Sequence, residues 1–195
     1  MKTSNDRLTR DNWLALALEI LAQEGRAKIK IEYIAERLGV TRGSFYAHFP
    51  DRREFNNSIA VYWAETLTSE ALANLRLNEG SAQERLLMLI QRIKDDDLPK
   101  YDIVMRAWAL DEPMVAEQVE RVDRERYQYI KSLFSEMGFT GNDLEVRTMV
   151  FQAYHSLSPA LQGSVFEKNR LKHVNVTHKL FIQKIDEDSD HIEEL

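Results

Sequence analysis

The sequence contains no cysteine, few glycines and prolines, and no long apolar run. Without cysteine the chain has no disulfide, no thiolate nucleophile and no cysteine-ligated zinc site. The most apolar run, NWLALALEILA, is short and carries Glu19, so it is too short to span a bilayer. The polar start MKTSNDRLTRDN lacks the apolar core of a secretory signal. We therefore expect a cytoplasmic protein with no membrane partner.

Charge is distributed unevenly along the 195 residues, whose net charge is −6. Residues 1–56 contain ten Lys or Arg and eight Asp or Glu, a balance of +2. Residues 57–195 contain sixteen and twenty-four, a balance of −8. A basic first segment followed by an acidic remainder indicates two functions along the chain.

Almost every segment shows helical periodicity, and the seven glycines and four prolines fall mostly between the periodic blocks. No run alternates as a strand would. The predicted fold class is all-α with about nine helices, comprising a three-helix helix-turn-helix domain over residues 1–50 and a larger helical domain over residues 51–195. Helices are expected at about 9–24, 31–38, 42–48, 51–75, from the Ser81 capping box onward, 99–110, 112–137, 142–162 (bent near Pro159) and 167–185.

The stretch AERLGVTRGSFYAHFPDRREF, residues 35–55, contains the most informative pattern. Two helices joined by a tight glycine turn form a helix-turn-helix, and Gly39 can adopt the left-handed conformation of such a turn. Phe45 and Phe49 are expected in the core. Gly43 disfavours a helix by about 1 kcal/mol relative to alanine. In so short a helix this cost indicates a use, such as close approach of the backbone to a DNA groove.

Residues 9–56 resemble the N-terminal domain of TetR-family transcriptional regulators. The resemblance rests on the order Ile34-Ala35, Leu38-Gly39-Val40-Thr41, Gly43-Ser44-Phe45-Tyr46 and His48-Phe49. The remainder matches that family only in helix number and length. The resemblance implies a sequence-specific regulator, more often a repressor, that binds a palindromic double-stranded operator as a homodimer and is released by a small ligand. It implies no cofactor and no metal.

The family's DNA contacts carry over to eight positions: Lys30, Thr41, Arg42, Gly43, Ser44, Tyr46, His48 and Arg52. Thr41 would cap the recognition helix and touch a phosphate, and the three residues after it would face bases. The Tyr46 hydroxyl and the His48 imidazole would bind phosphates. Lys30 stands where the family has threonine or serine, so the second helix loses that cap, although a lysine can still attract a phosphate.

The acidic remainder would hold an effector cavity and the dimer interface. Aromatic and methionine side chains suit an apolar or aromatic effector, and the candidate lining residues are Trp63, Met105, Trp108, Tyr127, Phe151 and Tyr154. The last two helices would pair with their copies in the partner, through Tyr154, Leu157, Leu161, Phe181, Ile182 and Ile185. Both sets could instead be ordinary core within one chain, and the sequence leaves that alternative open.

Two other functions compete with DNA binding. An enzyme is disfavoured because there is no glycine-rich phosphate loop and no nucleophile elbow. His155 and Ser156 are neighbours on one helix and point about 100° apart, while His173 and His178 are five residues apart, the wrong spacing for one metal. The second competitor is a helical interaction protein of the same fold that has lost DNA binding.

Overall fold

The computed structural model describes residues 8–157 and 173–184, and these ranges contain helices and turns but no strand. The helices are α1 (Arg10–Glu24), η1 (Arg26–Lys28), α2 (Ile31–Leu38), α3 (Arg42–Phe45), α4 (Arg52–Ala64), η2 (Glu65–Ser69), α5 (Glu70–Arg76), α6 (Ala82–Asp95), α7 (Pro99–Ala109), α8 (Pro113–Glu136), α9 (Gly141–Leu157) and α11 (Val174–Ile182). Apart from the single turn η1, and with α4, η2 and α5 counted as one continuous helix, the described ranges hold nine helices. The predicted all-α class is confirmed.

Several helices begin where the sequence supplies a cap. Thr9 and Ser81 each form a capping box with the residue three positions later, which satisfies orphan amide groups at both N-termini. The Asp51 side chain accepts from the Glu54 amide at 2.8 Å, so α4 begins directly after the helix-turn-helix. Pro99 and Pro113 occupy the first turns of α7 and α8, where no amide donor is needed.

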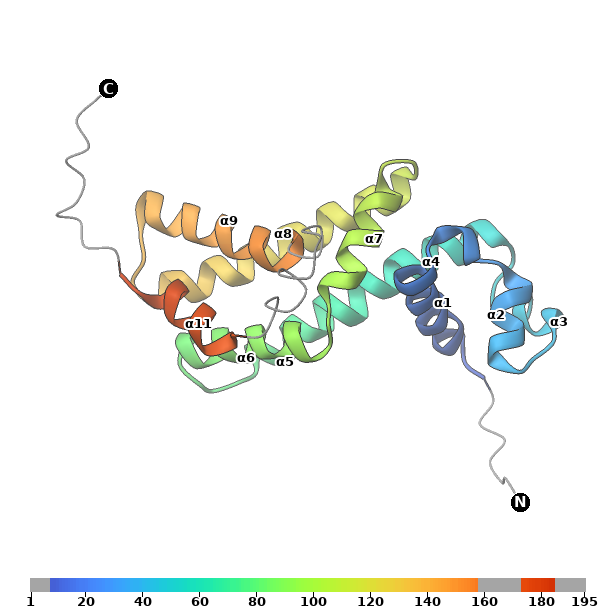
Figure 1. The fold of residues 1–195 in the computed structure, drawn as a ribbon, viewed down its shortest axis with the longest axis horizontal. Coiled ribbons are helices and arrows are strands. Elements are labelled where there is room, and N and C mark those ends of the chain that lie inside the picture. The colour runs from blue at the N-terminus through green and yellow to red at the C-terminus, as the bar shows by residue number, and fades with distance from the viewer. Residues whose placement is uncertain (1–7, 158–172, 185–195) are drawn as a thin grey trace, which may run out of the picture.

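Two hydrophobic cores divide the molecule (Figure 1). The first core joins α1–α4 to α7 and the first half of α8, and its largest buried side chains are Trp13, Phe45, Phe49, Phe55, Trp63 and Trp108. The second core joins α5 and α6 to the second half of α8, α9 and α11, and includes Leu86, Tyr129, Leu133, Phe134, Phe151 and Phe181. In Figure 1, α2 and α3 lie at one end of the molecule, whereas α9 and α11 lie at the other.

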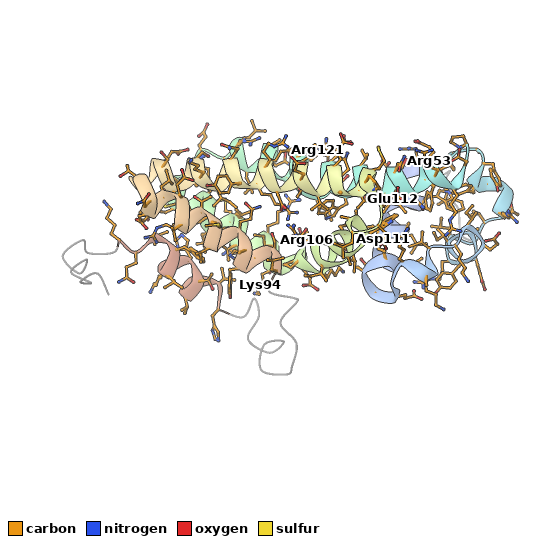
Figure 2. The ribbon with its side chains drawn as sticks, turned by 90° about the horizontal axis from the view of Figure 1, so that it is seen from above. Arg53, Lys94, Arg106, Asp111, Glu112 and Arg121 are labelled. Carbon is orange, nitrogen blue, oxygen red and sulfur yellow. The ribbon has the colours of Figure 1, made fainter. Side chains whose placement is uncertain are left out.

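The helix from Arg52 to Arg76 connects the two ends and is interrupted by the π-helical segment η2. Its first part, α4, packs on both α1 and α8. Helix α8 is braced in turn by Arg106 of α7, near the middle of Figure 2, whose guanidinium donates to both carboxylate oxygens of Asp123 at 2.8 and 2.5 Å. That pairing raises the pKa of Arg106. The path from the helix-turn-helix to the second core is therefore a continuous, laterally supported helix.

Parts of two expected helices lie outside the described residues. Helix α9 is described to Leu157, so the predicted bend near Pro159 falls beyond it, and α11 is described from Val174 to Ile182. None of the helices in the ranges 8–157 and 173–184 combines the length and the hydropathy needed to cross a membrane.

Candidate nucleic-acid interface and internal cavity

The turn between α2 and α3 follows from its glycine. Gly39 adopts φ 70° and ψ 30°, the left-handed conformation in which a side chain is disfavoured. Its amide donates back to α2, and the Val40 amide donates to the Ala35 carbonyl at 3.0 Å, which closes the helix end. The chain therefore reverses direction within two residues and presents α3 across α2.

An aromatic cluster fixes the buried side of α3. The Phe45 ring lies 5.6 Å from that of Trp13, 5.1 Å from that of Phe49 and 5.2 Å from that of Phe55, between ring centroids. All four rings are buried, as expected for Phe45 and Phe49. Phe45 is thus the buried side chain of this four-residue helix, whereas Arg42 and Gly43 are exposed.

The outward side of α3 carries the predicted DNA-contacting residues. Thr41, Arg42, Gly43 and Tyr46 are exposed, while Ser44 and His48 are half-buried. The Arg42 guanidinium pairs with Glu32 of α2 at 3.1 Å and lies 3.5 Å from the Tyr46 hydroxyl. These two contacts raise the pKa of Arg42, the Tyr46 hydroxyl being the larger cause. Both partners of the ion pair are mostly exposed, so phosphate or base atoms can replace Glu32 at little cost.

Two details of α3 differ from the expectation. Thr41 stands at the N-cap with extended backbone angles, but its side chain forms no capping hydrogen bond, so its hydroxyl is not committed to the helix. The helix also ends at Phe45 and not at His48, because the amides of Ala47 and His48 donate three residues back and tighten the last turn.

The two basic residues outside α3 differ in their contacts within the protein. Lys30 is exposed at the N-cap of α2 and forms no side-chain cap, as its identity predicts. The Arg52 guanidinium donates to the Ile29 carbonyl at 3.1 Å and so ties the start of α4 to the segment before α2. Arg52 thus holds the loop that carries Lys30, whatever else it contacts.

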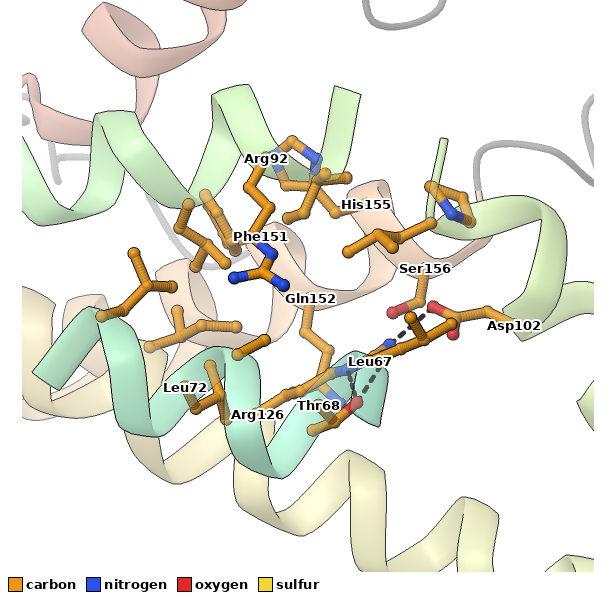
Figure 3. Close-up of a pocket in the computed structure, with 17 residues that line it drawn as sticks. Leu67, Thr68, Leu72, Arg92, Asp102, Arg126, Phe151, Gln152, His155 and Ser156 are labelled. Atoms are coloured by element: carbon orange, nitrogen blue, oxygen red, sulfur yellow. Dashed lines mark hydrogen bonds and ion pairs between the residues drawn. The ribbon is translucent and has the colours of Figure 1, made fainter. Parts of the chain in front are cut away.

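An internal cavity lies between η2, α5, α6, α7, α8 and α9 (Figure 3), with a free volume of about 50 Å³. Leucine, isoleucine and phenylalanine form much of its wall, and the polar lining residues include Thr68, Arg92, Asp102, Arg126, Gln152 and His155. Arg126 donates to Asp102 at 2.6 Å and to the Thr68 hydroxyl at 2.9 and 3.2 Å. This cluster links η2 to α7 and α8 inside the protein.

His155 is the most unusual of these groups because it is 5% exposed and neither ring nitrogen has a hydrogen-bond partner among the described residues. Burial lowers its pKa to about 3, so the ring is neutral at pH 7. It packs against Phe151, with 4.4 Å between ring centroids. A neutral imidazole of this kind offers one donor and one acceptor to whatever enters the cavity.

The predicted effector-contacting residues are scattered by the fold. Only Phe151 lines the cavity. Trp63, Met105 and Trp108 are buried in the first core, because their faces of α4 and α7 pack toward α1. Tyr127 lines an open groove between α8 and α9 and hydrogen-bonds Glu145, and Tyr154 is 42% exposed. The polar lining residues were not predicted, since nothing in the periodicity of five separate helical segments indicates that they meet.

The predicted dimer residues are also divided. Tyr154 and Leu157 are exposed on α9, but Phe181 is 6% exposed and packs on Phe151 with 4.9 Å between centroids. Phe181 is therefore a core residue of one chain, and Ile182 is half-buried beside it. Leu161 and Ile185 lie outside the described residues. Further exposed apolar side chains on these two helices are Val146, Met149, Val150, Val176 and Leu180.

A helix-turn-helix with an exposed second helix is the arrangement that DNA-binding proteins place in the major groove. Residues 14–58 match the sequence model of the family described as bacterial regulatory proteins, tetR family. Over these residues the chain matches that family, and the predicted resemblance is confirmed.

Solved structures share the fold along nearly the whole chain. A TetR transcriptional regulator from Legionella pneumophila is 13% identical, with a TM-score of 0.71, and the match covers 89% of this chain and 99% of that one. A putative transcriptional regulator from Saccharomonospora viridis in complex with choline is 18% identical (TM-score 0.68; 89% and 94%). The regulator FadR from Bacillus subtilis in complex with stearoyl-CoA is 14% identical (TM-score 0.65; 91% and 100%). No curated protein matches significantly by sequence.

Proposed function

We propose that the protein is a homodimeric repressor of transcription that binds a palindromic DNA operator and leaves it when a small apolar or aromatic effector binds. Residues 1–50 would read DNA, and residues 51–195 would bind the effector and the partner, in the cytoplasm. The observation that carries the proposal is the outward face of α3, where Arg42, Gly43 and Tyr46 are exposed while Phe45 is buried.

In this proposal the N-terminal end of α3 enters the major groove. Thr41 is available because its hydroxyl makes no capping bond, and Arg42, Gly43 and Ser44 would lie against base edges. Tyr46 and His48 would donate to phosphates on either side, with Lys30 and Arg52 adding positive charge nearby. A dimer would place two copies of α3 in successive major grooves, about 34 Å apart.

The test of DNA binding is the salt dependence of affinity for random duplex. The logarithm of the binding constant should fall with the logarithm of salt concentration, with a slope of about −0.9 for each phosphate neutralised. A flat dependence would contradict the proposal and favour an interaction protein that does not bind DNA. Selection of bound sequences from random duplexes should then yield a palindrome.

Two variants separate the roles within the interface. Tyr46→Phe removes a phosphate donor and should weaken binding to all duplexes alike, while Arg42→Ala should also blur the preference for the selected sequence. Both side chains are largely exposed, so neither change should alter the melting temperature much. Equal sequence preference in Arg42→Ala and the unmodified protein would contradict the base-reading role of Arg42.

Release by an effector requires that the cavity and α3 be coupled. An effector weakens DNA binding only through its different affinity for the DNA-competent and DNA-incompetent conformations. The continuous helix from Arg52 to Arg76 supports such coupling, because it starts beside α3 and its π-helical segment lines the cavity through Thr68. The choline and stearoyl-CoA complexes of proteins with this fold support a small-molecule effector as a class.

A further inference from the structure

Arg92 is the charged group of the cavity without a strong partner. Figure 3 shows its side chain extending from α6 toward the middle of the cavity. Its one ion pair is with Asp96, a neighbour on the same helix, through Nε at 3.5 Å. No hydrogen bond from its guanidinium is formed to any residue in the described ranges, and 35% of the side chain remains exposed. The planar fork of Arg92 is therefore available to a ligand at the open side of the cavity.

The second arginine of the cavity is already occupied. Arg126 pairs with Asp102 through one terminal nitrogen, and its Nε and its other terminal nitrogen both donate to the Thr68 hydroxyl. Among the lining residues the cations are Arg92 and Arg126 and the anion is Asp102, so the lining carries a net charge of +1 with His155 neutral. Asp96 lies outside the lining and pairs with Nε of Arg92, so the two terminal nitrogens of Arg92 are the groups that would attract an anion.

The geometry also orients a ligand. One oxygen of Asp102 is buried without a hydrogen-bond partner among the described residues, so a carboxylate placed beside it would be repelled. Arg92 and Asp102 lie on different sides of the cavity in Figure 3. The apolar wall formed by Leu72, Ile130 and Phe151 is the part of the lining that an aliphatic or aromatic body would contact.

We propose that the cavity binds a small apolar monocarboxylate, with the acid group on the Arg92 guanidinium and the apolar body against Leu72, Ile130 and Phe151. This inference rests on the proposed effector role of the cavity. Buried His155, with both ring nitrogens unpartnered, supplies a second donor to the ligand. A free volume of about 50 Å³ holds only a few atoms, so binding must widen the cavity and displace the helices around it.

The experiment compares ligands that differ only in the head group. Straight-chain carboxylates of four to eight carbons are titrated into the full chain by calorimetry, alongside the primary alcohol and the primary amine of each length. At one chain length or more, the acid is expected to bind at least tenfold more tightly than the alcohol and the amine. Equal or tighter binding of the alcohol or amine, or no binding by any acid, overturns the proposal.

Variants then assign the acid group to Arg92. Arg92→Gln should reduce the affinity for the acid about tenfold and leave the affinity for the alcohol unchanged. Arg92→Lys should give an intermediate loss, because lysine keeps the positive charge but cannot donate two parallel hydrogen bonds to a carboxylate. Arg124→Gln is the matched control, since Arg124 also pairs with an acid four residues away but lies outside the cavity. Unchanged acid affinity in Arg92→Gln, with an unchanged melting temperature, overturns the assignment.

Failure of the ligand proposal can be distinguished from failure of the proposed regulatory function. If the acids bind through Arg92 but leave the affinity for the selected duplex unchanged, the ligand site stands and release by effector fails. If the acids do not bind while the chain still binds DNA with a steep salt dependence, the ligand class fails and DNA binding stands.

Discussion

Among single residues, Gly43 is one that the fold does not require but that DNA binding is expected to require. Its backbone has no positive φ, and an added Cβ would meet only the Thr41 hydroxyl at 3.6 Å, an ordinary contact. Gly43→Ala should therefore keep or raise the melting temperature, since alanine favours a helix by about 1 kcal/mol. It should weaken duplex binding by about tenfold, or about 1.4 kcal/mol, if the backbone approaches a groove wall.

The matched control for that change is Gly39→Ala. Gly39 has φ +70°, so a side chain there is strained and the free energy of unfolding should fall by about 1 kcal/mol. Duplex affinity measured by fluorescence anisotropy and melting measured by circular dichroism give both readouts. Unaltered affinity in Gly43→Ala would show that the glycine has no role in close approach.

His155 makes a prediction about pH at the same scale. Its pKa is near 6.5 when unfolded and lowered to about 3 by burial, so the unfolded chain binds a proton that the folded chain excludes. Burying the neutral ring therefore costs no stability above pH 6.5, whereas the free energy of unfolding falls as pH falls from 6.5 toward 3. This one group changes the free energy of unfolding by at most about 1.4 kcal/mol per pH unit.

His155→Leu should flatten the dependence of unfolding free energy on pH between about 6 and 4, the window set by that shift. Chemical denaturation at several pH values measures the slope. His173→Gln, a change at an exposed histidine, should leave the slope as it is in the unmodified chain. Equal slopes in all three proteins would contradict the burial of a neutral ring at position 155.

At the scale of elements, η2 is the junction between the DNA-binding end and the cavity. Its Thr68 hydroxyl is buried and accepts two N–H groups of Arg126. Thr68→Val keeps the shape but leaves charged donors unpaired, which should cost about 1.5–3 kcal/mol of stability. Because the π-helical segment continues directly from α4, the change should also alter duplex affinity.

Thr148→Val is the comparison for this prediction. Thr148 is equally buried, but its hydroxyl donates only to the Leu144 carbonyl of its own helix, so the loss should be nearer to 1 kcal/mol. Urea unfolding and duplex titration measure both effects. A larger loss of stability in Thr148→Val, or unchanged duplex affinity in Thr68→Val, would contradict a special role for η2.

The sequence predicted features that depend on neighbouring residues, but not features that depend on residues far apart in the chain. The α2–α3 turn and the Ser81 capping box depend on residues a few positions apart, and both are present. The cavity instead combines Arg92, Asp102, Arg126 and His155 from four helices, whose meeting depends on how α7 crosses between α1 and α9. That crossing also carries Trp108 into the first core, away from the cavity where it was expected.

At the scale of the whole molecule, α9 and α11 leave apolar side chains uncovered at the end opposite α3. Met149 is 60% exposed, Val150 51% and Leu180 66%. Exposed apolar side chains on neighbouring elements are typical of an interface, and a dimer formed there would contain two copies of α3. Val150→Lys combined with Leu180→Glu should therefore shift the sedimentation of the protein toward the monomer and weaken operator binding.

Leu110→Glu is the control for the dimer prediction, because Leu110 is 87% exposed but follows α7, beside Asp111, whose ion pair with Arg26 places it at the DNA-binding end. It should sediment as the unmodified protein does. A double variant that remains dimeric, with its helical content retained, would contradict an interface on α9 and α11.

All three tryptophans of the chain lie in the first core, and the second core has none. Tryptophan fluorescence should therefore follow the melting of the first core, whereas far-ultraviolet dichroism follows both cores. Trp63 stands 5.8 Å beneath the guanidinium of Arg126, which belongs to the cavity. Its emission should shift when that cation moves, so the unlabelled protein carries a built-in optical reporter of cavity occupancy.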